Sequence, residues 1–96
     1  MHQHLNSTNL HLLMNKLQDN LTFEEYQNVV NLLLNWIFQV SSHLKSINPH
    51  HNRVQENLTQ LQQRVLSNHR KASLQHQSSG KFNHQPLLQT LSNFLY

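Results

Sequence analysis

The residues best suited to chemistry form a regular line in the second half of the chain. Polar and basic side chains recur there at alternating spacings of four and three residues, which on a helix keeps them on one face. At 1.5 Å per residue the line is about 27 Å long. We call it the polar stripe; it consists of Arg53, Asn57, Gln60, Arg64, Ser67 and Lys71, with His69 and Arg70 beside its end.

The polar stripe has the chemistry of a surface that binds a polyanion. Arginine and lysine reach phosphate oxygens, while amides and hydroxyls hydrogen-bond ribose 2′-hydroxyls and backbone oxygens. The chain has seven Lys and Arg against four Asp and Glu, and no acidic residue follows Glu56. The stripe therefore predicts shape-based binding of an RNA duplex. The alternative is an ordinary solvated helix face, because four cations over about five turns is a modest charge.

Nine histidines raise the question of a metal site. Two pairs are close in sequence, His2 with His4 and His50 with His51, yet no two histidines stand four residues apart. No acidic residue accompanies either pair. A zinc site needs three or four converging ligands, so we expect no bound metal and no cofactor.

The residue types that most catalytic sites need are scarce. There is no cysteine, and the single glycine, Gly80, cannot build a phosphate-binding loop or a nucleophile elbow. Three of the four acidic residues fall together within 19–25, at the start of one predicted helix. We therefore expect no catalytic residues and no enzymatic activity.

The elements that must position these side chains are helices. Thr22 and Glu25 form a capping box, which predicts a helix that begins at residue 23. Apolar residues then alternate at spacings of three and four as far as Ile47, with others on both flanks. A helix that is apolar on so many sides must be buried on several of them, so we expect a homodimer through 23–47. Its predicted core and dimer-interface residues are Tyr26, Val30, Leu33, Trp36, Ile37, Val40 and Leu44.

Weaker patterns define the other segments. We predict a flexible N-terminus over 1–7, a helix over 8–19, a turn at Pro49, a helix over 53–73, a linker without periodicity over 74–85 and a short helix over 86–96. The bundle domain is then 8–73. The fold class is all-α: an antiparallel helical hairpin or bundle of three to four helices, assembled as a dimer.

Composition also bears on origin and location. Ala, Gly, Val, Asp and Glu, whose codons all begin with G, number only 11 in total. This deficit is typical of a frame that overlaps another gene and favours a viral accessory protein; a cellular genome poor in G is the alternative. The longest mostly apolar stretch, Val29–Val40, is 12 residues, whereas a membrane span needs about 20. Without a secretory signal, we expect a cytoplasmic, non-secreted protein, in the host cell if it is viral.

In size and helical architecture, the expected dimer is similar to small viral suppressors of RNA silencing, such as the nodavirus type. We therefore expect an accessory protein without enzymatic activity that binds RNA through the polar stripe and suppresses host defence. The alternative is a protein-protein interaction module, an adaptor or an antagonist of a host protein, that uses the exposed face of 23–47 or the segment 86–95. A third possibility is a cellular coiled-coil protein.

Overall fold

The chain forms four helices that pack into a bundle. The computed structural model describes residues 8–47 and 52–96, and those residues contain no strand. The helices are α1 (Thr8–Leu17), α2 (Phe23–Ile47), α3 (Asn52–Ser79) and α4 (Gln85–Leu95). Each packs against the next, and α4 closes the ring against α1. The predicted all-α class and the helical bundle are therefore confirmed.

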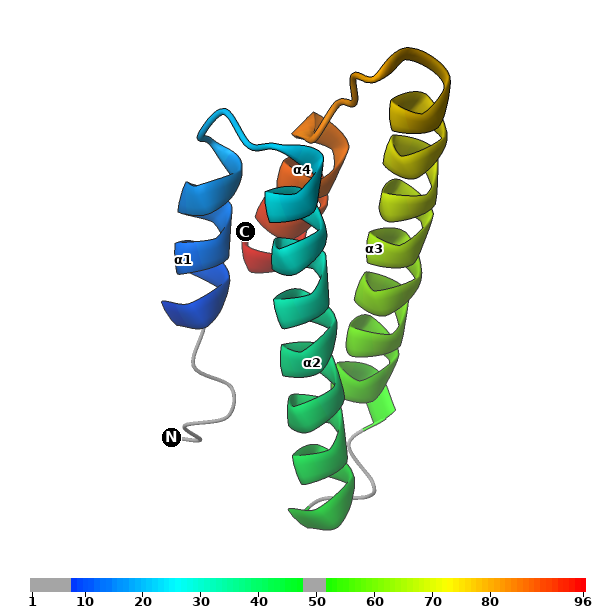
Figure 1. Cartoon of the computed structure of the whole chain (residues 1–96). Helices are drawn as coiled ribbons and strands as arrows, with labels where there is room; N and C mark the ends of the chain where they lie inside the picture. The colour runs from blue at the N-terminus through cyan, green and yellow to red at the C-terminus, as the bar shows by residue number, and fades with distance from the viewer. Residues whose placement is uncertain (1–7, 48–51) are drawn as a thin grey trace.

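Two short helices pack against two long ones. The chain runs up, down, up and down through the four helices, and α1 and α4 lie against the upper part of the α2–α3 hairpin (Figure 1). α3 has 28 residues and α4 only 11, so the first turns of α3 extend beyond the end of α4. This difference in length exposes one side of α3 beside the end of α4.

α1 is shorter than predicted. It ends at Leu17 rather than at residue 19, because the Gln18 and Asp19 backbone N–H groups donate to carbonyls only three residues back. Such tight bonds close a helix. The predicted flexible segment 1–7 and the turn at Pro49 lie outside the described residues.

The capping box of α2 is confirmed. The Glu25 backbone N–H donates to the Thr22 hydroxyl at 3.1 Å, and the Thr22 backbone N–H donates to Glu25 Oε1 at 2.9 Å. These reciprocal bonds satisfy two amides that have no partner inside the helix. The hydrogen bond from the Thr22 backbone N–H also holds the pKa of Glu25 below its ordinary value.

The apolar seam of α2 is covered within a single chain. α1 and α3 both pack on this helix, and the side chains concerned are at most 4% exposed: Tyr26, Val30, Leu33, Ile37, Val40 and Leu44. Trp36 is partly buried against the same core. A second copy of the chain is therefore not needed to cover the seam. Self-association stays a prediction for measurement in solution.

α2 keeps two large apolar side chains in solvent. Leu32 is 58% exposed and Phe38 is 70% exposed. They stand six residues apart, about 240° around the helix. They therefore lie on different flanks of α2 and do not form one continuous apolar face.

α3 continues six residues beyond the predicted end at 73, so the first part of the predicted linker 74–85 is helical. The reason is a set of ring contacts at its C-terminal end. His76 stacks on Phe23 of α2 with ring centroids 4.3 Å apart, and Phe82 meets the same Phe23 ring edge-on at 5.3 Å. The helix ends at Gly80, whose φ of 75° is the left-handed conformation that closes helices.

α4 is docked on the bundle. Its Leu87 and Leu91 are fully buried, and Asn68 of α3 donates from Nδ2 to the Thr90 hydroxyl at 2.7 Å. The apolar face of the predicted C-terminal segment is thus buried within the chain, so less of this face is available to a partner. No helix of residues 8–47 and 52–96 is long and apolar enough to cross a membrane.

Candidate nucleic-acid interface

The polar stripe lies along α3, and its side chains are exposed except for partly buried Ser67. The structure brings three of them together around one pocket, namely Asn57, Gln60 and Arg64. Arg53 and Lys71 continue the line beyond the pocket at its two ends. The middle of the stripe therefore borders a pocket between α3 and α4.

Two predicted neighbours of the stripe are placed elsewhere. Arg70 lines a different, shallow pocket of about 370 Å³ on α3, beside the exposed Leu66 and Leu74. His69 turns inward and lies 6.0 Å from the rings of both Phe23 and Tyr26. The reason is helical geometry, because consecutive residues point about 100° apart.

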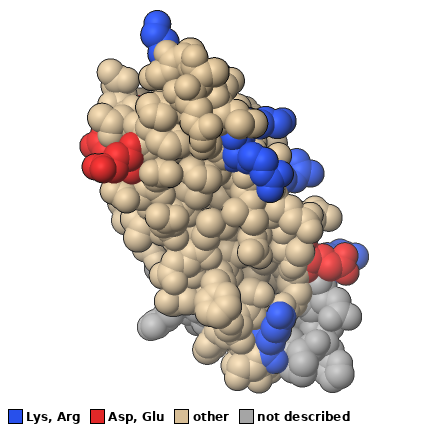
Figure 2. All heavy atoms as spheres, turned by 45° about the vertical axis from the view of Figure 1, so that its right-hand side comes forward, with Lys and Arg blue, Asp and Glu red and all other residues tan. Residues whose placement is uncertain are grey.

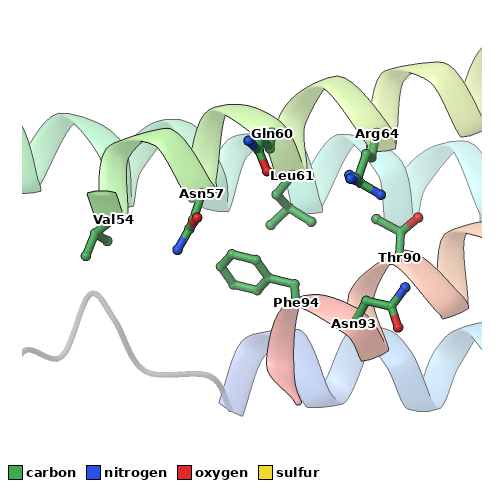
Figure 3. A pocket seen from close by; sticks show the side chains of 8 residues that line it. All are labelled: Val54, Asn57, Gln60, Leu61, Arg64, Thr90, Asn93 and Phe94. Carbon is green, nitrogen blue, oxygen red and sulfur yellow. The ribbon is translucent and has the colours of Figure 1, made fainter. Parts of the chain in front are cut away.

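The pocket between α3 and α4, called the α3–α4 pocket below, has a volume of about 540 Å³. Besides the stripe residues, α3 contributes Val54 and Leu61, and α4 contributes Thr90, Asn93 and Phe94. Arg64, Thr90 and Asn93 lie together at one end, and the Phe94 ring lies between them and Val54 (Figure 3). The volume falls in the range of about 300–1,000 Å³ that small ligands occupy.

The polar end of the α3–α4 pocket presents hydrogen-bond donors. The Thr90 hydroxyl oxygen already accepts from Asn68, and Asn93 Oδ1 accepts from Gln89 Nε2 at 2.9 Å. The Asn68 amide is oriented by a second bond, in which Nδ2 donates to the Pro86 carbonyl at 3.3 Å. The Asn93 amide N–H groups and the Arg64 guanidinium are left to donate to a ligand. These groups suit an anion.

Charge is unevenly distributed over the molecule. Figure 2 shows basic side chains gathered on one side of this face and an acidic group on its opposite edge, with one further acidic side chain low on the basic side. The acids Asp19, Glu24 and Glu25 belong to the α1–α2 corner, whereas Glu56 is the only acid on α3 and α4. Within the described residues, no ion pair neutralises the cations of α3.

The contribution of α4 could not be predicted from sequence. Thr90, Asn93 and Phe94 were expected only as parts of a short amphipathic segment, and nothing local indicates which helix it meets. A second feature that sequence reasoning missed is the ring cluster of Phe23, His69, His76 and Phe82. The Nδ1 atoms of both histidines are buried without a hydrogen-bond partner among the described residues.

No group of three or more metal-ligating side chains occurs in the part of the chain that the structure describes. The histidine pairs at 2 and 4 and at 50 and 51 lie outside it. Comparisons with protein-family models, curated proteins and solved structures find no match to this chain. The chemistry of the polar stripe and the α3–α4 pocket is therefore what bears on function.

Proposed function

We propose that this protein binds duplex RNA through the polar stripe of α3 and acts without enzymatic chemistry, as a small viral-type accessory protein that sequesters RNA from host defence. The single observation that carries the proposal is the line of cations and polar side chains along α3, which is exposed except for partly buried Ser67 and has no acidic residue beside it from residue 57 onward. Cations that have no protein partner are available to phosphates.

The shape of α3 supports this assignment. It is one unbroken helix, so the cations at residues 53, 64 and 71 keep a fixed spacing over about 27 Å. The amides and hydroxyls between them match the 2′-hydroxyls and phosphates of an A-form minor groove. Recognition of this kind reads shape and charge rather than sequence. A dimer would present the line twice and raise the affinity, although one chain already carries the whole line.

The test is a gel-shift and fluorescence-anisotropy titration with a generic RNA duplex over a range of salt concentrations. The test variant is Arg53→Glu with Lys71→Glu, because both side chains are exposed and neither lines the α3–α4 pocket. We expect salt-sensitive binding of the native chain. In the variant, affinity should fall at least tenfold, and the slope of log K against log salt should flatten by about 2.

The matched control is Lys16→Glu with Lys45→Glu, which changes the net charge equally but lies on α1 and α2. It should bind RNA far better than the stripe variant. Equal weakening in both variants would show a general charge effect, and absence of retardation at low salt would overturn the proposal. A DNA duplex of the same sequence should bind more weakly, because it lacks the 2′-hydroxyls.

The alternative is a protein-protein interaction module, and one observation favours it. Leu66 and Leu74 are 39% and 60% exposed on either side of Arg70, away from the stripe. A contiguous exposed apolar patch is a feature of surfaces that bind protein partners. If RNA binding fails, this patch and Phe38 of α2 are the surfaces to mutate in a search for a protein partner.

A further inference from the structure

The α3–α4 pocket has a mixed chemistry that the polar stripe alone does not require. One end holds donors and a positive charge, and the other end holds the apolar side chains Val54, Leu61 and Phe94. A straight duplex needs only an exposed line of cations and amides. A pocket that has both an aromatic ring and anion-binding groups fits a ligand that carries an anionic group and a flat ring.

We infer that the α3–α4 pocket binds a nucleoside 5′-phosphate, with the phosphate on Arg64 and Asn93 and the base against Phe94. The inference rests on the proposed function, since it names the nucleotide that the RNA interface would capture. The nucleotide comes either from an unpaired position of a bound strand or from free solution. Both sources share this chemistry.

At the end of the pocket that would hold the phosphate, side-chain oxygens already accept hydrogen bonds from within the chain. Asn68 Nδ2 donates to the Thr90 oxygen, and Gln89 Nε2 donates to the Asn93 oxygen, which leaves the Asn93 amide N–H groups to donate to a ligand. Arg64 adds a guanidinium that no described acid neutralises. In Figure 3 the Arg64 side chain and the Asn93 nitrogen lie at the same end of the pocket and come from two helices, whereas the Thr90 oxygen points away from Phe94. A phosphate has enough acceptor oxygens for both Arg64 and Asn93.

The part of the pocket that would hold the base has the Phe94 ring and the side-chain amides of Asn57 and Gln60. Phe94 provides a face for stacking, as aromatic side chains do for unstacked bases. Asn57 and Gln60 line the same pocket from α3, and each carries one acceptor and two donors. Asn and Gln pair with the donor and acceptor edge of adenine, which makes adenosine 5′-monophosphate a suitable probe.

The test is an NMR titration of the full chain with adenosine 5′-monophosphate, adenosine and inorganic phosphate, each alone. We expect saturable shifts at the backbone amides of α4 and of residues 57–64 with the monophosphate, and binding at least tenfold weaker with adenosine or phosphate. Arg64→Gln should weaken monophosphate binding at least tenfold. Phe94→Leu keeps an apolar side chain and should weaken binding of both adenosine and the monophosphate.

The matched control is Arg70→Gln, which removes a cation of the same helix from outside the α3–α4 pocket. It should bind the monophosphate like the native chain. Equal affinity of Arg64→Gln and Arg70→Gln for the monophosphate, or no binding to the native chain, would overturn the inference. Circular dichroism of Phe94→Leu checks that α4 stays folded, and Arg64→Gln is decisive if it does not.

Two further experiments identify the source of the nucleotide and test this inference separately from the proposed function. A duplex with one unpaired adenosine at its end should bind at least fivefold better than a blunt duplex, and Phe94→Leu should abolish the gain. Monophosphate binding without that gain assigns the pocket to a free nucleotide. The Arg53→Glu and Lys71→Glu variant should lose duplex binding and keep monophosphate binding, so the two hypotheses can fail separately.

Discussion

The Phe23 ring lies flat against the imidazole of His76, with centroids 4.3 Å apart and planes within 5° of parallel. The contact joins the first residue of α2 to the last turn of α3. Phe82, in the loop after α3, meets both rings edge-on, at 5.3 Å from Phe23 and 6.3 Å from His76. This cluster fixes the top of the hairpin and determines where the chain turns back to form α4.

The first prediction concerns the end of α3. His76→Ala removes the stacked ring, so the last two turns should fray while the rest of the helix stays folded. Hydrogen exchange of the backbone amides at 74–80 should accelerate, and the exchange of those at 58–65 should not change. Gln77→Ala, an exposed neighbour in the same turn, is the control and should leave both regions protected. Unchanged exchange in His76→Ala would contradict the role of the stack.

Gly80 supports the second prediction. Its φ of 75° is strained for other residues, but a Cβ built there meets no atom within 4 Å. Gly80→Ala should therefore cost about 1 kcal/mol of unfolding free energy through backbone strain alone. Gly80→Asn should cost less, because asparagine tolerates this conformation better. Urea denaturation measures both. A larger loss in Asn than in Ala would show that side-chain size, and not φ, limits the position.

The start of α2 could be predicted from the sequence, whereas the end of α3 could not. The start of α2 depends on Thr22 and Glu25, which are three residues apart, so the pattern is visible in the sequence. The end of α3 depends on His69 and His76, which read as polar breaks in an apolar pattern. Their burial comes from Phe23, some 50 residues away in sequence, and only the folded chain shows that contact.

The candidate site follows the same rule. The polar stripe depends on spacing within one helix, so its exposed line could be predicted. The pocket that Arg64 lines depends on where α4 packs, and the burial of Leu87 and Leu91 holds α4 there. Likewise, the bond from Asn68 of α3 to the Thr90 hydroxyl of α4 joins residues that are 22 apart in sequence. Tertiary contacts of this kind leave no local signal.

The third prediction concerns acid stability. The pKa of Glu25 is lowered in the folded chain by the Thr22 backbone N–H, so the ionised carboxylate stabilises the fold above its unfolded-state pKa. That contribution is lost as the pH falls through the lowered folded-state pKa. Glu25→Gln should therefore be less stable than the native chain at pH 7, with the difference shrinking toward pH 3. Urea midpoints measured across this range give the comparison.

The control for the acid prediction is Glu24→Gln, which removes a charge from the same turn but leaves the capping box intact. Its effect should be smaller at every pH. Thr22→Ala removes the hydroxyl partner of the Glu25 amide and should cost about 1 kcal/mol at pH 7. If Glu24→Gln reproduces the pH profile of Glu25→Gln, the helix dipole rather than the capping box carries the effect.

The fourth prediction concerns Tyr26, whose side chain is fully buried and whose hydroxyl has no hydrogen-bond partner among the described residues. Burial raises its pKa to about 12 from the ordinary 10.0. The unfolded chain therefore loses the phenol proton first, and stability should fall as the pH rises from 10 toward 12. Tyr26→Phe should lack this part of the alkaline loss. At pH 7 it should be as stable as the native chain or more so, because an unpaired buried hydroxyl is removed.

The control for Tyr26 is Tyr96→Phe, which alters an exposed tyrosine at the end of the chain. Lysine deprotonation affects both variants equally, so the difference between their urea midpoints isolates the buried phenol. A drop in stability of Tyr26→Phe at pH 7 would show that the hydroxyl has a hydrogen-bond partner in solution and would contradict this prediction.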